Sequence, residues 1–307
     1  MAVLGVIAQT IILIIFAPLL SGFIRKIKNN IRMRKGAPVL QPYYNFFKLL
    51  FKDEVISENS SWIFGLSPFI VLASSITALL LMPVINGIVS LNQMGDILVL
   101  ISLLALGRFF LALAGMDVAS AFGGMGSSRE MFISSLVEPV MLVAVFAVSL
   151  NCGSTSMAVI SSASIFKLST LVAVLALLMV TVSETSRIPV DNQETHLELT
   201  MIHEAMLLEY SGRSLALIEL SAHIKQLIFY SLLANILLPL NSVYFNTGLF
   251  GIFIALGLYL IKVFLIGLFI AIIEVSMAKM RLFRAVDFIG FSFALSILAV
   301  VLQTAGF

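Results

Sequence analysis

Charge and cysteine are both scarce in this sequence. Only 11% of its 307 residues are charged, whereas 60% are hydrophobic and the mean hydropathy is +1.11. A soluble domain has about a quarter of its residues charged, so a soluble protein of this length could not cover its surface with so few charges. Lipid must therefore be the solvent for much of the chain.

The single cysteine, Cys152, excludes a disulfide within the chain. It also excludes an iron–sulfur cluster held by this chain alone, because such clusters need several thiolates. His196, His203 and His223 lack the close spacing of a metal site. The sequence has no phosphate-binding glycine loop, zinc spacing or nucleophile elbow. We therefore expect no cofactor in this chain and no redox catalysis by the chain alone.

Long apolar runs are what the sequence has in abundance. Eight of them approach the length of about 20 residues that a helix needs to cross the hydrocarbon core. They cover residues 3–24, 66–90, 96–115, 131–151, 166–184, 226–241, 247–274 and 286–306. The first run lacks a basic start, which favours a retained helix over a signal peptide. The predicted fold is an all-α integral membrane protein, with about eight transmembrane helices forming one domain over residues 1–307.

Basic residues are distributed unevenly between the connecting loops. Fifteen of the eighteen lysines and arginines fall in the loops after the first, third, fifth and seventh runs, and only Lys167 falls in the opposite loops. The positive-inside rule makes the basic loops cytoplasmic and puts both termini outside. Residues 25–63 and 185–225 then form the long cytoplasmic loops. Within the first, residues 43–51 form an amphipathic, aromatic-rich segment suited to the membrane surface.

A dense acidic segment follows the fifth run. Its notable members are Glu184, Arg187, Pro189, Asp191, Glu194, Glu198 and Glu209. Glu194 and Glu198 would share one face of a helix, where like charges repel, so a shared proton or a cation such as Arg187 must offset them. A plain solvated loop is the alternative interpretation of this segment.

Ionisable residues also occur inside the apolar runs, where charge is costly. Glu138 lies about two turns into the fourth run, and it either forms a buried salt bridge to Arg129 or Arg108 or carries protons. Lys262 and Glu274 lie in the seventh run, twelve residues apart. That spacing is about 18 Å along a helix, so each of the two needs another partner.

Several of these residues belong to motifs that are spread over most of the chain. In order, the motifs are Ala17-Pro-Leu-Leu-Ser-Gly22, Arg34-Lys-Gly-Ala-Pro-Val-Leu-Gln41, Gly107-Arg-Phe-Phe110, Gly126-Ser-Ser-Arg-Glu130, Val137-Glu-Pro139, Glu184-Thr-Ser-Arg-Ile-Pro189, Glu209-Tyr-Ser-Gly212 and Glu274-Val-Ser-Met-Ala278. With them the chain resembles the subunit 1 family of respiratory complex I. Within that family it resembles the branch serving group 4 nickel–iron hydrogenases, such as formate hydrogenlyase and hydrogenase-4.

The resemblance implies a non-catalytic subunit of an oxidoreductase complex in the cytoplasmic (inner) membrane. The subunit would link redox events in a hydrophilic arm, docked on the two long loops, to proton or sodium movement. Its partners would be hydrogenase large and small subunits, an iron–sulfur subunit and antiporter-like membrane subunits, with no nucleic acid. Those partners would carry a NiFe centre and iron–sulfur clusters.

The family pattern also implies roles for individual residues. The residues expected to line a chamber below the nearest cluster are Glu184, Arg187, Asp191, Glu194, Glu198 and Glu209. Arg129 and Glu138 match family positions in the fourth run. Lys262 and Glu274 are candidates for passing a charge change to antiporter-like partners.

One departure from the family bears on the choice of branch. The segment between Pro189 and Glu209 is longer than in the quinone-reducing branch, which favours the hydrogenase branch. Alternatives are a quinone-reducing, complex I-like subunit, a passive membrane tether and a stand-alone transporter. The absence of inverted repeats counts against the transporter.

Overall fold

The structure is a computed structural model that describes residues 2–83, 95–162, 167–191, 201–238 and 248–306. Over these residues every named element is an α-helix. Seven helices are long and apolar enough to cross a membrane. They are α1 (Ala2–Ile31), α3 (Trp62–Leu80), α4 (Ile97–Asp117), α5 (Ala121–Cys152), α9 (Gly212–Leu237), α10 (Gly248–Ser276) and α11 (Leu282–Thr304).

An eighth apolar helix, α7 (Leu168–Glu184), is shorter, at 17 residues. Three short helices complete the described set, namely α2 (Gln41–Leu50), α6 (Met157–Ser162) and α8 (His203–Leu207). The predicted all-α bundle of about eight spans is thus confirmed, and the protein is a multi-pass membrane protein.

Polar side chains at the starts of three helices accept hydrogen bonds from backbone amides. Ser61, Asp96 and Ser120 cap α3, α4 and α5, each accepting a hydrogen bond from an amide in the first turn. Asp117, at the other end of α4, accepts a hydrogen bond from the Ser61 amide at 2.7 Å. The two acidic residues that flank the third apolar run are therefore boundary residues.

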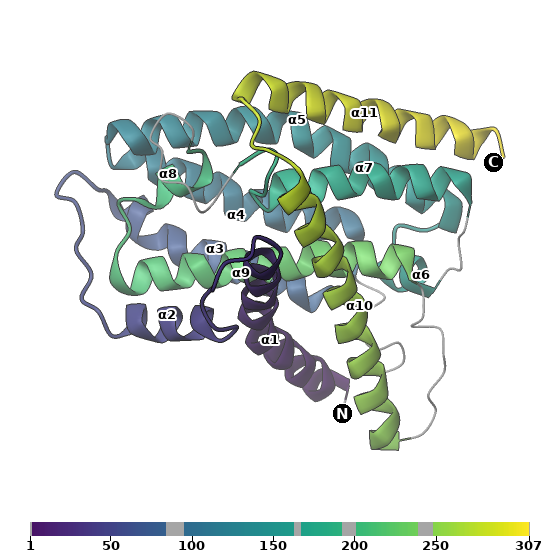
Figure 1. Cartoon of the computed structure of the whole chain (residues 1–307), viewed down its shortest axis with the longest axis horizontal. Coiled ribbons are helices and arrows are strands. Elements are labelled where there is room, and N and C mark those ends of the chain that lie inside the picture. The colour runs from purple at the N-terminus through teal and green to yellow at the C-terminus, as the bar shows by residue number, and fades with distance from the viewer. Residues whose placement is uncertain (1, 84–94, 163–166, 192–200, 239–247, 307) are drawn as a thin grey trace.

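The helices form two groups that differ in direction (Figure 1). α3, α4, α5, α7, α9 and α11 run roughly side by side, whereas α1 and α10 cross them steeply. α11 packs against α5 and α7, and α10 packs against α1 and α9. A continuous, mainly aliphatic hydrophobic core joins the two groups.

The α2 helix coincides with the predicted amphipathic segment. Its Tyr43 hydroxyl donates a hydrogen bond to the Ile15 carbonyl of α1, and burial raises the pKa of that hydroxyl. Tyr44 and Phe47 on the same helix are exposed. α2 is therefore hydrogen-bonded to α1 through Tyr43, and it exposes Tyr44 and Phe47 on its outer surface.

α5 begins earlier than the apolar run predicts, at Ala121 rather than at residue 131. The added turns are rich in glycine, and these glycines allow close helix approach. A Cβ on Gly123 would lie 2.4 Å from the Gly115 carbonyl oxygen, and one on Gly126 would lie 2.8 Å from the Ala205 Cβ. The glycines thus bring α4 and α8 against the start of α5.

α9 also begins earlier than predicted, at Gly212 rather than at residue 226. Gly212 has a φ of 51°, and a Cβ there would lie 2.7 Å from the Asp53 carbonyl oxygen, so glycine suits this start. The residues from 212 to 225 are therefore helical and not an open part of the 185–225 loop. An apolar-run criterion passes over them because polar side chains here face an internal cavity instead of lipid.

Candidate functional site

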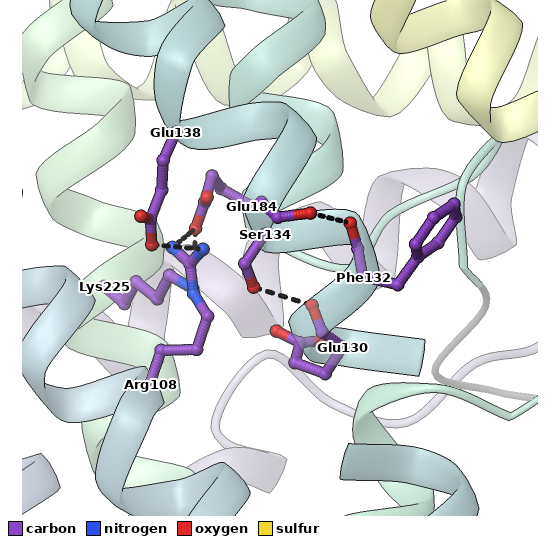
Figure 2. Close-up of polar contacts among 8 residues, drawn as sticks. Arg108, Glu130, Phe132, Ser134, Glu138, Glu184 and Lys225 are labelled. Carbon is purple, nitrogen blue, oxygen red and sulfur yellow. Dashed lines mark hydrogen bonds and ion pairs between the residues drawn. The ribbon is translucent and has the colours of Figure 1, made fainter. Parts of the chain in front are cut away.

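Four charged side chains from four helices form a cluster around Arg108, which we call the Arg108 cluster. In Figure 2 the Arg108 guanidinium lies between the carboxylates of Glu138 and Glu184. Arg108 Nη1 is 3.2 Å from Glu138 Oε1, and Arg108 Nη2 donates to Glu184 Oε2. Lys225 Nζ, from α9, is 2.9 Å from the same Glu184 oxygen. The cluster thus alternates acid and base from α5 through α4 and α7 to α9.

A second set, the Glu274 cluster, joins α1, α9 and α10 to the turn after α7. Lys28 Nζ is 2.7 Å from Glu274 Oε1, and Arg187 Nη1 is 3.3 Å from Glu274 Oε2. Arg187 Nη2 also donates to Gln226 Oε1 at 2.9 Å. Lys28, Arg187 and Glu274 are all buried. The electrostatic attraction within each ion pair is therefore strong, because water does not screen it.

The turn after α7 connects the two clusters. Glu184 is the last residue of α7, and Arg187 follows it after a left-handed residue, Ser186, with a φ of 51°. The Arg187 amide bonds back to the Val182 carbonyl at 3.0 Å. Because the chain reverses here, Glu184 points to the Arg108 cluster while Arg187 reaches the Glu274 cluster.

Asp191 extends this turn toward the link between α10 and α11. Its Oδ1 lies 2.9 Å from Lys279 Nζ, and its Oδ2 accepts a hydrogen bond from the His203 amide at 3.3 Å. The Met280 amide donates to the Pro189 carbonyl at 2.9 Å. The acidic segment after the fifth run is therefore held in place by the protein rather than left as a plain solvated loop, over the residues that the structure describes.

Both clusters border one cavity of about 470 Å³, which we call the inner cavity. Its polar wall includes Arg25, Lys28, Arg108, Glu184, Arg187, His203, Glu204, Glu219, His223, Lys225 and Gln226. Arg108 Nε, His203 Nδ1 and Gln226 Nε2 are buried atoms with no hydrogen-bond partner among the described residues. Buried polar atoms around a roomy polar cavity are the normal setting for ordered water, so we expect the inner cavity to be hydrated.

Glu138 borders a second cavity, of about 440 Å³, between α4 and α5, and Arg108 borders both cavities. Ser102, Ser134 and Ser135 line it together with apolar side chains. The Glu138 side chain keeps 36% of its surface exposed, whereas that of Glu184 keeps 2%. Glu138 is therefore the accessible member of the Arg108 cluster.

The outcome for the predicted residues is mixed. Of the two partners proposed for Glu138, the structure selects Arg108, while Arg129 Nη1 instead donates to the Met201 carbonyl at 3.0 Å. Glu194 and Glu198 lie outside the described residues, so the proposed offset of their charges by Arg187 stays a prediction.

Three other predicted residues differ in their surroundings. Glu209 is half-buried in the turn before α9 and makes no ion pair with the described residues. Lys262 is almost fully buried within α10. Glu274 has the separate partners that its spacing from Lys262 requires, namely Lys28 and Arg187.

Sequence reasoning missed Lys28, Lys225, Gln226, Glu219 and His223 as site residues. In the sequence, Lys28 and Lys225 were used only as basic loop residues that indicate the cytoplasmic side of the membrane. Glu219, His223 and Gln226 recur at helical spacing and line the inner cavity from one face of α9. This helical periodicity of polar residues is the sequence signal from which a polar, cavity-lining face of α9 could have been predicted.

Comparison with known proteins adds a family to this geometry. A family model described as NADH dehydrogenase matches residues 3–305. Hydrogenase-4 component C of Escherichia coli (strain K12) is 34% identical over 298 residues, which cover 95% of this chain and 93% of that protein. Formate hydrogenlyase subunit 4 of the same strain is 32% identical over 302 residues, covering 96% and 97%.

More distant similarities point the same way. NADH-quinone oxidoreductase subunit 8 of Rhodothermus marinus is 28% identical over 218 residues, 65% of this chain and 62% of that protein. A chain of the archaeal membrane-bound sulfane sulfur reductase, a respiratory membrane complex, has the same fold, with a TM-score of 0.81 and 22% identity over 97% of this chain and 99% of that chain. The family match spans nearly the whole sequence, and the chain belongs to the NADH dehydrogenase family, the family of complex I subunit 1.

Proposed function

We propose that this chain is the membrane anchor and ion-coupling subunit of an energy-converting, membrane-bound nickel–iron hydrogenase. Two relatives with more than 30% identity over nearly the full length carry the names of hydrogenase-4 and formate hydrogenlyase subunits. In this proposal the NiFe centre and the iron–sulfur clusters belong to hydrogenase large and small subunits and an iron–sulfur subunit. Antiporter-like subunits adjoin this chain in the membrane.

The proposed location is the cytoplasmic membrane, with the basic loops inside and both termini outside. The concentration of lysine and arginine in alternate loops supports this orientation. The loops around residues 25–63 and 185–211 would then meet the hydrophilic arm at the end of the bundle where the inner cavity lies. Redox chemistry in the arm would thus occur next to the buried ion pairs.

The observation that carries the proposal is the chain of ion pairs joined by the turn after α7. Glu184 and Glu274 each bridge two cations, and the two clusters share the inner cavity. An added electron about 10 Å away changes the energy of a carboxylate by roughly 1.7 kcal/mol at an effective dielectric of 20. That energy alters a proton-binding equilibrium by more than tenfold, so redox state would control the proton occupancy of an accessible carboxylate linked to these ion pairs, such as Glu138.

The experiment is to purify the complex containing this chain in mild detergent and to assay viologen-linked hydrogen evolution. A co-purifying nickel-binding large subunit with hydrogen activity supports the proposal. Sealed proteoliposomes then test for proton or sodium movement during hydrogen evolution. Quinone reductase activity without nickel would contradict the hydrogenase assignment.

A quinone-reducing, complex I-like role is the second candidate. The inner cavity of about 470 Å³ supports it because Val71, Leu104 and Leu111 give part of the wall an apolar surface. Inhibition of the assembled complex by a quinone analogue would favour this role. A passive tether is the third, and under it Glu138→Gln and Glu274→Gln complexes that assemble would move ions as the wild type does.

A further inference from the structure

A file of buried polar side chains continues away from the Glu274 cluster along the seam between α9, α10 and α1. We call it the polar column. Its members are Gln226, Tyr230, Ser231 and Asn235 on α9, Tyr259 and Lys262 on α10, and Gln9 on α1. All of them are buried at 8% exposure or less, in helices long and apolar enough to cross a membrane.

The inner end of the polar column is continuous with the Glu274 cluster. Gln226 accepts a hydrogen bond from Arg187, which is itself paired with Glu274. Tyr230 lies one helical turn beyond Gln226 on α9. The Tyr230 hydroxyl lies beside Gln226 and within electrostatic reach of Arg187 and Glu274. The column therefore begins at the wall of the inner cavity.

The middle of the column joins α9 to α10. Ser231 and Tyr259 share a hydrogen bond between their hydroxyls. Tyr259, Lys262, Ile266, Ile270 and Glu274 are all buried and recur every three or four residues, so they occupy one inward face of α10. Lys262 thus faces the same interior as the tyrosine and the glutamate.

The far end of the column reaches the residues that follow α3. Asn235 Nδ2 donates to the Pro83 carbonyl at 3.2 Å, and Gln9 Nε2 lies 3.5 Å from the Met82 carbonyl oxygen. These adjacent carbonyls come from the end of α3 that is opposite to its cap at Ser61. Asn235 and Gln9 therefore converge on the side of the bundle away from the inner cavity.

Three polar atoms of the column lack a well-formed hydrogen bond in the described part of the chain. They are Gln226 Nε2, Tyr230 Oη and Gln9 Oε1, and each is buried. An unpaired polar atom is costly anywhere in a protein interior and more so at membrane depth. Their positions, two near the inner end and one near the far end, are the positions that bound water would satisfy.

We propose that the polar column holds bound water and carries protons between the inner cavity and the opposite side of the membrane, with Lys262 as its protonatable group. In its neutral form the Lys262 amine takes a proton from protonated water on the cavity side, forming an N–H bond as an O–H bond of the hydronium ion breaks and neutral water remains. The ammonium then gives a proton to a water molecule on the far side, which leaves as protonated water, and the amine is regenerated. The proposal rests on the ion-coupling function and assigns it a route within this chain.

The test uses the intact complex in sealed liposomes, in sodium-free buffer, with the ratio of protons moved to hydrogen formed as the readout. Tyr230→Phe is the sharpest variant, because it removes a hydroxyl that lies beside the Gln226 side chain without a well-formed hydrogen bond in the described part of the chain. As a purely structural group, a hydroxyl without a well-formed hydrogen bond contributes little, so its loss would leave the stability of the protein about unchanged. If the hydroxyl is part of a water path, its loss breaks that path. We then expect the ratio of protons moved to hydrogen formed to fall at least fivefold.

Lys262→Met should lower the ratio at least tenfold, and Lys262→Arg should not restore it because arginine does not deprotonate. Ser231→Ala and Ser292→Ala form a matched pair, since both serines are almost fully buried in membrane helices. Ser292 lies on α11, outside the column, and donates to the Ala176 carbonyl. We expect Ser231→Ala to lower the ratio and Ser292→Ala to keep it.

Wild-type ratios in both Tyr230→Phe and Lys262→Met would overturn the polar column while leaving the ion-coupling function intact. If Lys262→Met does not assemble, Tyr230→Phe decides alone. A wild-type complex that moves ions only with sodium present would overturn the column as a proton route. A wild-type complex that makes hydrogen but moves no ion would overturn the ion-coupling function itself.

Discussion

The Arg108 and Glu274 clusters are built from the same parts but differ in enclosure. In each, one carboxylate bridges two cations, and both border the inner cavity. The Lys28, Arg187 and Glu274 side chains keep 8% of their surface or less exposed. In the Arg108 cluster, Lys225 keeps 19% and Glu138 keeps 36%. Enclosure favours a fixed ion pair, whereas a more open side chain leaves room for exchange of protons.

The comparison assigns different roles to the two clusters. Breaking an enclosed pair leaves a buried charge uncompensated, so the Glu274 cluster should hold the bundle together. A partly exposed carboxylate contributes little to stability, so Glu138 should matter for coupling instead. Substitution of the carboxylates should therefore affect mainly stability in the Glu274 cluster and mainly ion coupling at Glu138.

The largest expected effect is that of Glu274→Gln. The amide cannot neutralise Lys28 and Arg187, so we expect a loss of stability of about 3–5 kcal/mol. The measurement is thermal unfolding and assembly of the detergent-purified complex. Glu209→Gln is the matched control, because Glu209 makes no ion pair with the described residues, and its melting temperature should stay at that of the wild type. Equal melting temperatures for all three proteins would contradict the structural role of Glu274.

Glu184→Gln should follow, with a loss of stability of about 3 kcal/mol, the lower end of the range for a broken buried pair. Its partner Lys225 can turn toward water in the inner cavity, which limits the cost. The same thermal unfolding experiment shows which of the two variants loses more stability. A larger loss for Glu184→Gln than for Glu274→Gln would reverse the relation between enclosure and stability.

Glu138→Gln should change stability by about 1 kcal/mol or less. Its contact with Arg108 is 3.2 Å long and partly exposed, and Arg108 keeps Glu184 as a partner. We nevertheless expect the number of ions moved per hydrogen formed to fall severalfold, because the amide has no titratable group. Glu138→Asp should restore part of the coupling by returning a carboxylate, and its failure to do so would argue against proton exchange at this position.

The smallest effect concerns a buried tyrosine outside both clusters. The Tyr210 hydroxyl donates to the Phe64 carbonyl at 3.1 Å, and burial raises the pKa of this hydroxyl above its ordinary value of 10.0. Above pH 10 the unfolded chain therefore releases the phenol proton while the folded chain keeps it, so Tyr210 stabilises the fold below pH 10 and loses that contribution as pH rises. The free energy of unfolding of Tyr210→Phe should fall less steeply between pH 10 and 12 than that of the wild type. Parallel profiles of unfolding free energy against pH would contradict this.

The membrane spans were predictable because hydrocarbon imposes a length and an apolar composition on each helix. Partners of Glu138 and Glu274 inside the bundle were predictable in kind, since isolated charge at membrane depth is costly. The identity of the Glu274 partner was not, because Lys28 is 246 positions away in sequence and no local pattern links the two. The early start of α9 escaped prediction because Glu219, His223 and Lys225 face an internal cavity that only the folded bundle creates.

The most direct test of the account is ion movement per hydrogen formed in sealed liposomes, measured side by side for the wild-type complex and the Glu138→Gln complex. Redox-linked proton exchange at the Arg108 cluster predicts a measurable ratio in the wild type and a severalfold lower ratio in an assembled Glu138→Gln complex of wild-type thermal stability. An unchanged ratio in Glu138→Gln would show that the accessible carboxylate does not carry the coupling.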